Sequence, residues 1–184
     1  MCAHELILGE TTDFITGETL TDTIDERARQ EIARFLVEEK GYLKSDLEVR
    51  RKIFLEVDDH EGSFKVTFTV RLETKSFMII IFGPGSLVSR ERPALAAARL
   101  LEAYEIPLTV VTNGKTAEVL ETASGSVRGE GLESIPSKAQ ALEELAGTQF
   151  QTLTDEHLAK ERRILYAFEV LAEKECNEFT CNLY

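Results

Sequence analysis

The spacing of apolar residues along the chain distinguishes helices from strands. From residue 23 to residue 40, apolar residues recur at intervals of three and four with charged residues between them, which is typical of an amphipathic helix. Thr23 opens the segment, acidic residues occupy its first turn and Gly41 follows its end, so both ends carry residues that favour helix caps. The pattern predicts a helix over residues 23–40.

Three segments in the first half of the chain are typical of strands. Residues 47–57 alternate roughly, residues 65–72 alternate well and are rich in β-branched side chains, and residues 77–82 are apolar throughout. The polar cluster at residues 58–62 predicts a turn, and Glu73-Thr74-Lys75 predicts the turn of a tight hairpin. Because residues 77–82 are apolar on both faces, we expect them at the centre of a sheet that is covered on both sides.

The second half of the chain alternates between helices and strands. Pro93 is well placed in the first turn of a helix that begins near residue 91 and ends near residue 104. The remaining segments are strands at 107–112 and 117–120, a Gly/Ser-rich loop at 121–137, and helices at 137–146 and 154–175. This order predicts an α/β fold with a mixed sheet flanked by helices and a C-terminal helical extension over about 137–175.

Composition narrows the classes of function. The chain has 184 residues, 43% hydrophobic and 29% charged, which fits one domain over residues 1–184. The net charge of -12 argues against a general nucleic-acid coat, because an acidic surface repels phosphate. No apolar stretch approaches the roughly 20 residues of a membrane span. The N-terminal residues do not resemble a signal peptide, and three cysteines do not make a disulfide framework, so we expect a cytoplasmic protein with no membrane partner.

Several short strings, taken in order, resemble a known family. They are Asp22-Thr23 with Glu26, Ala28-Arg29-Gln30, Glu39-Lys40-Gly41-Tyr42, Leu47-Glu48-Val49 and Val110-Val111-Thr112-Asn113-Gly114. Through them, about residues 13–122 resemble the N-terminal domain of type I restriction enzyme R subunits, in the PD-(D/E)XK nuclease superfamily. The resemblance implies a restriction-endonuclease-like fold in which carboxylates and a lysine on a hairpin hold Mg²⁺ and cleave DNA.

The active-site pattern of that family is degenerate in this sequence. The resemblance places the aspartate of the first hairpin strand at Thr67, and the acid and the lysine of the second strand at Ile79 and Ile81. Threonine is a poor magnesium ligand and isoleucine is none. The resemblance therefore implies a pseudo-enzyme that binds a nucleic acid or a protein partner without cutting.

A relocated catalytic site is the alternative. Glu73-Thr74-Lys75 has the form acid-x-lysine, and Asp59 lies upstream of it. With Mg²⁺, Asp59, Glu73 and Lys75 would make an active endodeoxyribonuclease. The same residue types are common in hairpin turns, which point into solvent.

Two further sets of residues are candidates for binding. Basic residues near the expected nucleic-acid face, which are also typical of solvated faces or ion pairs, are Arg50, Arg51, Lys52, Arg90 and Arg92. The terminal residues with soft or borderline donor atoms are Cys2, His4, Cys176 and Cys181. Four such ligands suit tetrahedral zinc, and chain termini are often close together in compact domains.

The terminal cysteines leave two interpretations open. Some relatives in the nuclease superfamily carry an iron–sulfur cluster at terminal cysteines, so zinc or an iron–sulfur group would make this chain a metal-stapled structural module. The spacing Cys176-x4-Cys181 differs from the usual two-residue spacing of zinc ligands, and reduced thiols near the chain ends explain it as well. The sequence leaves the oligomeric state open.

Overall fold

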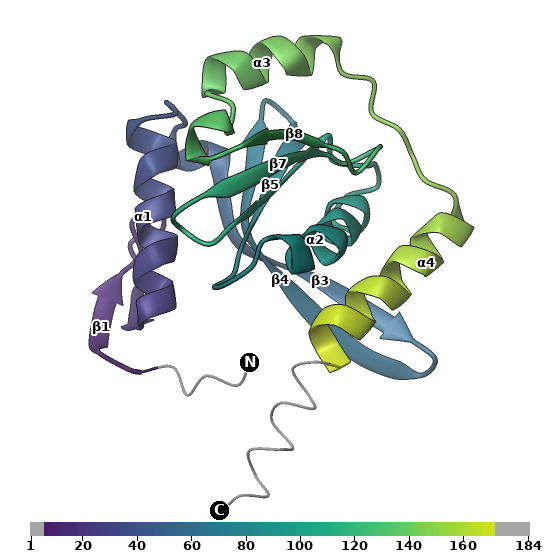
Figure 1. The fold of residues 1–184 in the computed structure, drawn as a ribbon, viewed down its shortest axis with the longest axis horizontal. Coiled ribbons are helices and arrows are strands. Elements are labelled where there is room, and N and C mark those ends of the chain that lie inside the picture. The colour runs from purple at the N-terminus through teal and green to yellow at the C-terminus, as the bar shows by residue number, and fades with distance from the viewer. Residues whose placement is uncertain (1–5, 172–184) are drawn as a thin grey trace, which may run out of the picture.

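The computed structural model describes residues 6–171, whose main body is a six-stranded mixed sheet between two layers of helices (Figure 1). The strands lie in chain order, as β3 Leu47–Val57, β4 His60–Leu72, β5 Lys75–Phe82, β6 Leu108–Thr112, β7 Ala117–Glu121 and β8 Val127–Glu130. Neighbouring strands are antiparallel except β5 and β6. That parallel pair requires a crossover, which helix α2 (Val88–Leu100) supplies. The predicted mixed α/β fold is confirmed.

Both ends of helix α1 (Ile24–Glu38) lie within two residues of the predicted bounds, 23 and 40. The Thr23 hydroxyl accepts a hydrogen bond from the Glu26 amide at 3.0 Å, which satisfies an orphan donor of the first turn. At the other end Gly41 adopts a positive φ of 76°, and the Tyr42 amide donates to the Leu36 carbonyl at 3.1 Å. Glycine reaches this backbone region without steric cost, so the chain turns back toward the sheet.

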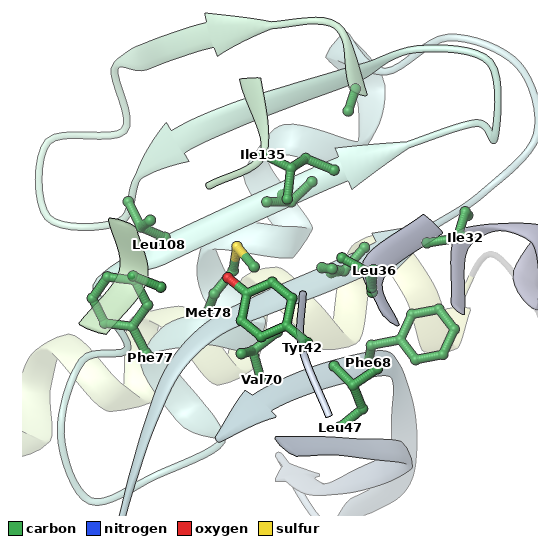
Figure 2. Packing of buried hydrophobic residues seen from close by; sticks show 14 of the residues in the cluster. Ile32, Leu36, Tyr42, Leu47, Phe68, Val70, Phe77, Met78, Leu108 and Ile135 are labelled. Atoms are coloured by element: carbon green, nitrogen blue, oxygen red, sulfur yellow. The ribbon is translucent and has the colours of Figure 1, made fainter. Parts of the chain in front are cut away.

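One face of the sheet packs against α1. The core cluster on this face, called the first cluster, includes Ile32, Leu36, Tyr42, Leu47, Phe68, Val70, Met78, Ile80, Phe82 and Ile135. Figure 2 shows the ring of Tyr42 among Leu36, Val70 and Met78. The Tyr42 hydroxyl donates to the Pro136 carbonyl at 2.9 Å, so the one polar atom of this buried side chain is satisfied.

The opposite face packs against α2 and against α4 (Asp155–Leu165), which continues as a π-helix over Tyr166–Leu171. The core cluster on this face, called the second cluster, includes Ile53, Leu55, Phe64, Val66, Ile79, Ile81, Ala94, Ala97, Leu165, Tyr166 and Val170. Alternate residues of β5 therefore enter different clusters. This explains why residues 77–82 are apolar throughout and confirms their central position.

Three short strands lie where the sequence shows no strand pattern. β1 (Gly9–Thr12) and β2 (Thr19–Asp22) form a separate hairpin beside α1, and β8 lies within the predicted loop at 121–137. Most residues of these strands are exposed, so no alternation of apolar residues marks them. The short 3-10 helices η1 (Lys44–Asp46) and η2 (Leu132–Ser134) and the helix α3 (Lys138–Gly147) complete the fold.

Some predicted boundaries are wrong. Helix α2 begins at Val88, so Pro93 lies inside it and is not in its first turn. The turn between β3 and β4 is only Asp58-Asp59, both with positive φ, because β4 already begins at His60. The α-helical part of the C-terminal helix ends at Leu165, where the backbone changes to a π-helix. Among residues 6–171, the structure contains no helix with the length and hydropathy of a membrane span.

Gly62 makes room for the C-terminal helix. A Cβ atom at this position in β4 would lie 2.7 Å from Val170 Cγ1 and 3.2 Å from Tyr166 Cε2. We therefore expect Gly62→Ala to lower the free energy of unfolding by about 1–3 kcal/mol, measured by urea denaturation, because the C-terminal helix must shift. Gly147→Ala is the matched control, since nothing lies within 4 Å of its Cβ position. Equal stability of the two variants would mean that the C-terminal helix does not pack on β4.

Candidate functional site

A cavity of about 270 Å³ lies at the junction of the sheet, α1 and the turn after β1. It lies on the side of the sheet that packs against α1. Its polar and charged lining residues are Asp13, Glu26, Arg29, Gln30, Arg50, Lys65 and Thr67, with Val49, Val66, Phe68 and Phe82 as apolar walls. This cavity brings together two carboxylates, two arginines and a lysine, and we take it as the candidate site.

At this cavity the buried side chains of the β3–β4 hairpin change from one face of the sheet to the other. Arg50 has a φ of 54°, a region that costs energy for a non-glycine residue. Before this point Val49 and its partner Phe68 face the first cluster, and beyond it Ile53 and Phe64 face the second. The change of face at Arg50 directs its side chain into the cavity beneath the β1–β2 hairpin.

Asp13 is the most constrained carboxylate of the cavity. Its side chain is buried and pairs with the Arg50 guanidinium, and its Oδ1 accepts the amides of Ile15 at 2.8 Å and Thr16 at 3.0 Å. Burial alone would raise the pKa of Asp13, but the hydrogen bonds from Arg50, Thr16 and Ile15 outweigh it and hold the pKa below its ordinary value. Asp13 is therefore an ionised group whose oxygens are already used.

Glu26, the other carboxylate in the cavity, is also occupied. One oxygen accepts Gln30 Nε2 at 2.7 Å and the other accepts Arg29 Nη1 at 3.2 Å. The Arg29 guanidinium in turn lies 5.1 Å from the centre of the Phe82 ring. The Gln30 carbonyl oxygen accepts the Phe14 amide at 2.7 Å, so the same group of side chains ties α1 to the β1–β2 hairpin.

The family-equivalent hairpin positions carry no metal ligand here. Thr67 lines the cavity, and its hydroxyl accepts the Phe82 amide at 3.0 Å. Ile79 and Ile81 lie in the second cluster, on the face of the sheet away from the cavity. The β5 residue that does reach the cavity is Phe82, so this strand presents an apolar side chain there.

The residues of the predicted relocated site lie far apart. Asp59 is in the turn before β4 and Glu73 in the turn after it, and this 13-residue strand separates them by roughly 40 Å. The ammonium of Lys75 lies 4.5 Å from the ring centre of Tyr104 and 5.2 Å from that of Phe150. The structure therefore does not bring Asp59, Glu73 and Lys75 together. Within residues 6–171, no group of three or more His, Cys, Asp or Glu side chains could hold a metal ion.

Most of the predicted nucleic-acid-binding residues have acidic partners in the same chain. The partners are Asp13 and Glu18 for Arg50, Glu48 and Glu102 for Arg51, and Glu161 for Arg92, while Arg90 donates to the Pro84 carbonyl. Lys52 is exposed on β3, and no described residue pairs with it. The structure therefore supports the ion-pair interpretation for Arg50, Arg51 and Arg92.

Sequence reasoning missed the cavity because it missed Asp13. The string from Asp13 to Gly17 forms the turn between β1 and β2, in which Gly17 has a φ of 77° and its amide donates to the Asp13 carbonyl at 2.8 Å. Asp followed by Gly four residues later, between Thr-rich segments, is a turn signal that could have located this hairpin. Cys2, His4, Cys176 and Cys181 lie outside the described residues, so metal binding at the termini stays a prediction.

A comparison with models of protein families gives a match. The model described as type I restriction enzyme R protein N terminus (HSDR_N) matches residues 24–136. This range contains α1, all six strands of the main sheet and α2, and leaves out the β1–β2 hairpin, α3 and α4. No curated protein and no solved structure matches the chain.

The pair of Asp13 and Arg50 predicts a pH-dependent stability. We expect Arg50→Met to lower the free energy of unfolding at neutral pH by about 1–3 kcal/mol, because Asp13 stays buried without its cation. Since folding lowers the pKa of Asp13, this stabilisation is present above the ordinary carboxyl pKa of about 4 and is lost as the pH falls through the lowered value. Urea denaturation at several pH values measures both effects.

The control for this experiment is Arg128→Met. Arg128 pairs with Glu144 at a more exposed position, so its loss should cost less than about 1 kcal/mol. The account of Asp13 fails if the Arg50→Met variant is as stable as this control, or if its difference from the unmutated chain does not shrink in acid.

Proposed function

Because the chain belongs to the family of type I restriction enzyme R protein N-terminal domains, we propose that it is a restriction-nuclease-like domain that acts by binding and does not cleave DNA. The observation that carries the proposal is the state of the two cavity carboxylates. Asp13 and Glu26 are both held by arginines of the same chain. A metal-dependent nuclease needs free carboxylates, because the metal takes them as ligands, and neither carboxylate of the cavity is free.

The cavity residues do not fit Mg²⁺. This ion prefers near-octahedral oxygen coordination, with one or two carboxylates supplied by the protein. Binding it would require Asp13 to leave Arg50 and two backbone amides, or Glu26 to leave Arg29 and Gln30. The other side-chain oxygens of the cavity are the Thr67 hydroxyl, which accepts the Phe82 amide, and the Gln30 carbonyl, which accepts the Phe14 amide. The cavity therefore offers Mg²⁺ no free side-chain oxygen.

The charge distribution favours a protein as the binding partner. Affinity for a phosphate backbone comes from lysines and arginines that release counterions, and an arginine already paired with a carboxylate contributes little. Arg50, Arg51 and Arg92 are all paired in this way, and the chain as a whole carries a net charge of -12. Binding to a protein surface does not require unpaired lysines and arginines.

Calorimetric titration of Mn²⁺ into the chelator-treated protein tests the proposal. Cys176→Ser with Cys181→Ser removes thiols that would bind the metal at the C-terminus. In this variant we expect no heat of binding at millimolar Mn²⁺, and no cleavage of plasmid DNA in the same buffer, because no carboxylate of the cavity is free.

The informative comparison adds Asp13→Asn and Glu26→Gln to the same background. Heat of binding or DNA cleavage that is present before these changes and lost after them would contradict the proposal, because it would locate a working metal site in the cavity. Heat that persists after the changes would come from other carboxylates and would leave the cavity without a metal.

A further inference from the structure

The outer part of the β3–β4 hairpin extends beyond the rest of the sheet. β5 pairs with β4 only over Phe68–Leu72, so residues 51–66 form a two-stranded ribbon (Figure 1). One face of this ribbon packs on the C-terminal helix through Ile53, Leu55 and Phe64. No described part of the chain packs on the opposite face, which we call the outer face.

The outer face consists of three rows of paired residues. The rows are Lys52 opposite Lys65, Phe54 opposite Ser63, and Glu56 opposite Glu61. All six side chains are exposed, and Phe54, in the middle row, is 79% exposed. A positive row and a negative row therefore lie on either side of the exposed Phe54 ring.

This arrangement is unfavourable within one chain. Like charges directly opposite each other on neighbouring strands destabilise a sheet, and the outer face has two such rows. Among the described residues, none pairs with Lys52, Glu56, Glu61 or Lys65. Opposite charges brought from outside would relieve both rows at once, and an apolar contact would cover the ring.

A second copy of the chain supplies those charges. Successive rows are about 6.8 Å apart along the strands, so the two charged rows are equally distant from the middle row. A twofold axis that lies along the middle row reverses the strand direction in the facing copy. Lys52 then faces Glu56 of the facing copy, and Lys65 faces its Glu61, while the two Phe54 rings meet on the axis. The outer face is thus complementary to itself.

We propose that the outer face is the interface of a twofold dimer of this chain. The proposal does not depend on the loss of nuclease chemistry. Three rows of a two-stranded ribbon cover less area than the roughly 1,200 Å² of stable interfaces, so the dimer is weak and depends on protein concentration. Its ion pairs lie at the surface, so salt weakens it. Lys65 also lines the cavity, which places the second copy beside the cavity mouth.

Sedimentation velocity over a range of protein concentrations tests the dimer. We expect the weight-average sedimentation coefficient of the full chain to rise with concentration at low salt, and to rise much less at about 1 M salt, where the Debye length is about 3 Å. Lys52→Glu with Lys65→Glu makes both charged rows acidic, and Glu56→Lys with Glu61→Lys makes both basic. Each variant alone should remain monomeric, because like charges then face each other across the axis.

Mixing the two variants gives the sharpest outcome. An acidic face and a basic face are complementary along their whole length, so an equimolar mixture should sediment as a heterodimer. Both variants keep like charges opposite each other within the chain, so the mixture reports contacts between chains and not a change in hairpin stability. Lys160→Glu, at an exposed site on α4, is the control and should leave dimerisation unchanged.

Three results would overturn the proposal. An unmutated chain that stays monomeric at every concentration would assign the outer face to a different protein. Dimerisation that survives both charge-reversal variants, or a mixture of folded variants that remains monomeric, would place the interface elsewhere on the molecule.

Discussion

The pairing of Asp13 with Arg50 connects the separate parts of this molecule. Arg50 lies where the long β3–β4 hairpin turns from one face of the sheet to the other, and its positive φ directs the guanidinium toward the N-terminal hairpin. Asp13 closes the turn of that hairpin with two backbone hydrogen bonds and accepts the guanidinium with its other oxygen. A buried carboxylate needs such a partner. The pair therefore joins the wall of the cavity, which contains Asp13, to the point in β3 where the sheet changes face, which is Arg50.

The same ion pair decides what the cavity can do. The chain belongs to the family of type I restriction enzyme R protein N-terminal domains, and in its cavity arginines are the positive partners of both carboxylates. The pairs are complete without any added ion. Neither carboxylate is therefore free to bind a metal ion, and on this observation we base the proposal of a domain that binds and does not cut.

Features that rest on local pattern could be predicted from the sequence. The caps of α1 follow from short-range spacing, and the central position of the apolar residues 77–82 in β5 follows from their burial on both faces. The cavity could not be predicted, because Asp13 and Arg50 are 37 residues apart and meet only once the sheet has formed. Lys75 shows that a local pattern does not fix the surroundings of a side chain. In the sequence it belongs to an acid-x-lysine string, but in the fold its ammonium lies against Tyr104 and Phe150.

Carbon-13 NMR of the Asp13 side-chain carboxyl, recorded against pH with and without Mg²⁺, tests the central claim most directly. The account predicts that Asp13 titrates below the ordinary value of about 4 and that its chemical shift does not respond to Mg²⁺, because Arg50 and two amides already occupy its oxygens. An ordinary pKa, or a selective and saturable change in the Asp13 signal on adding Mg²⁺, would contradict it.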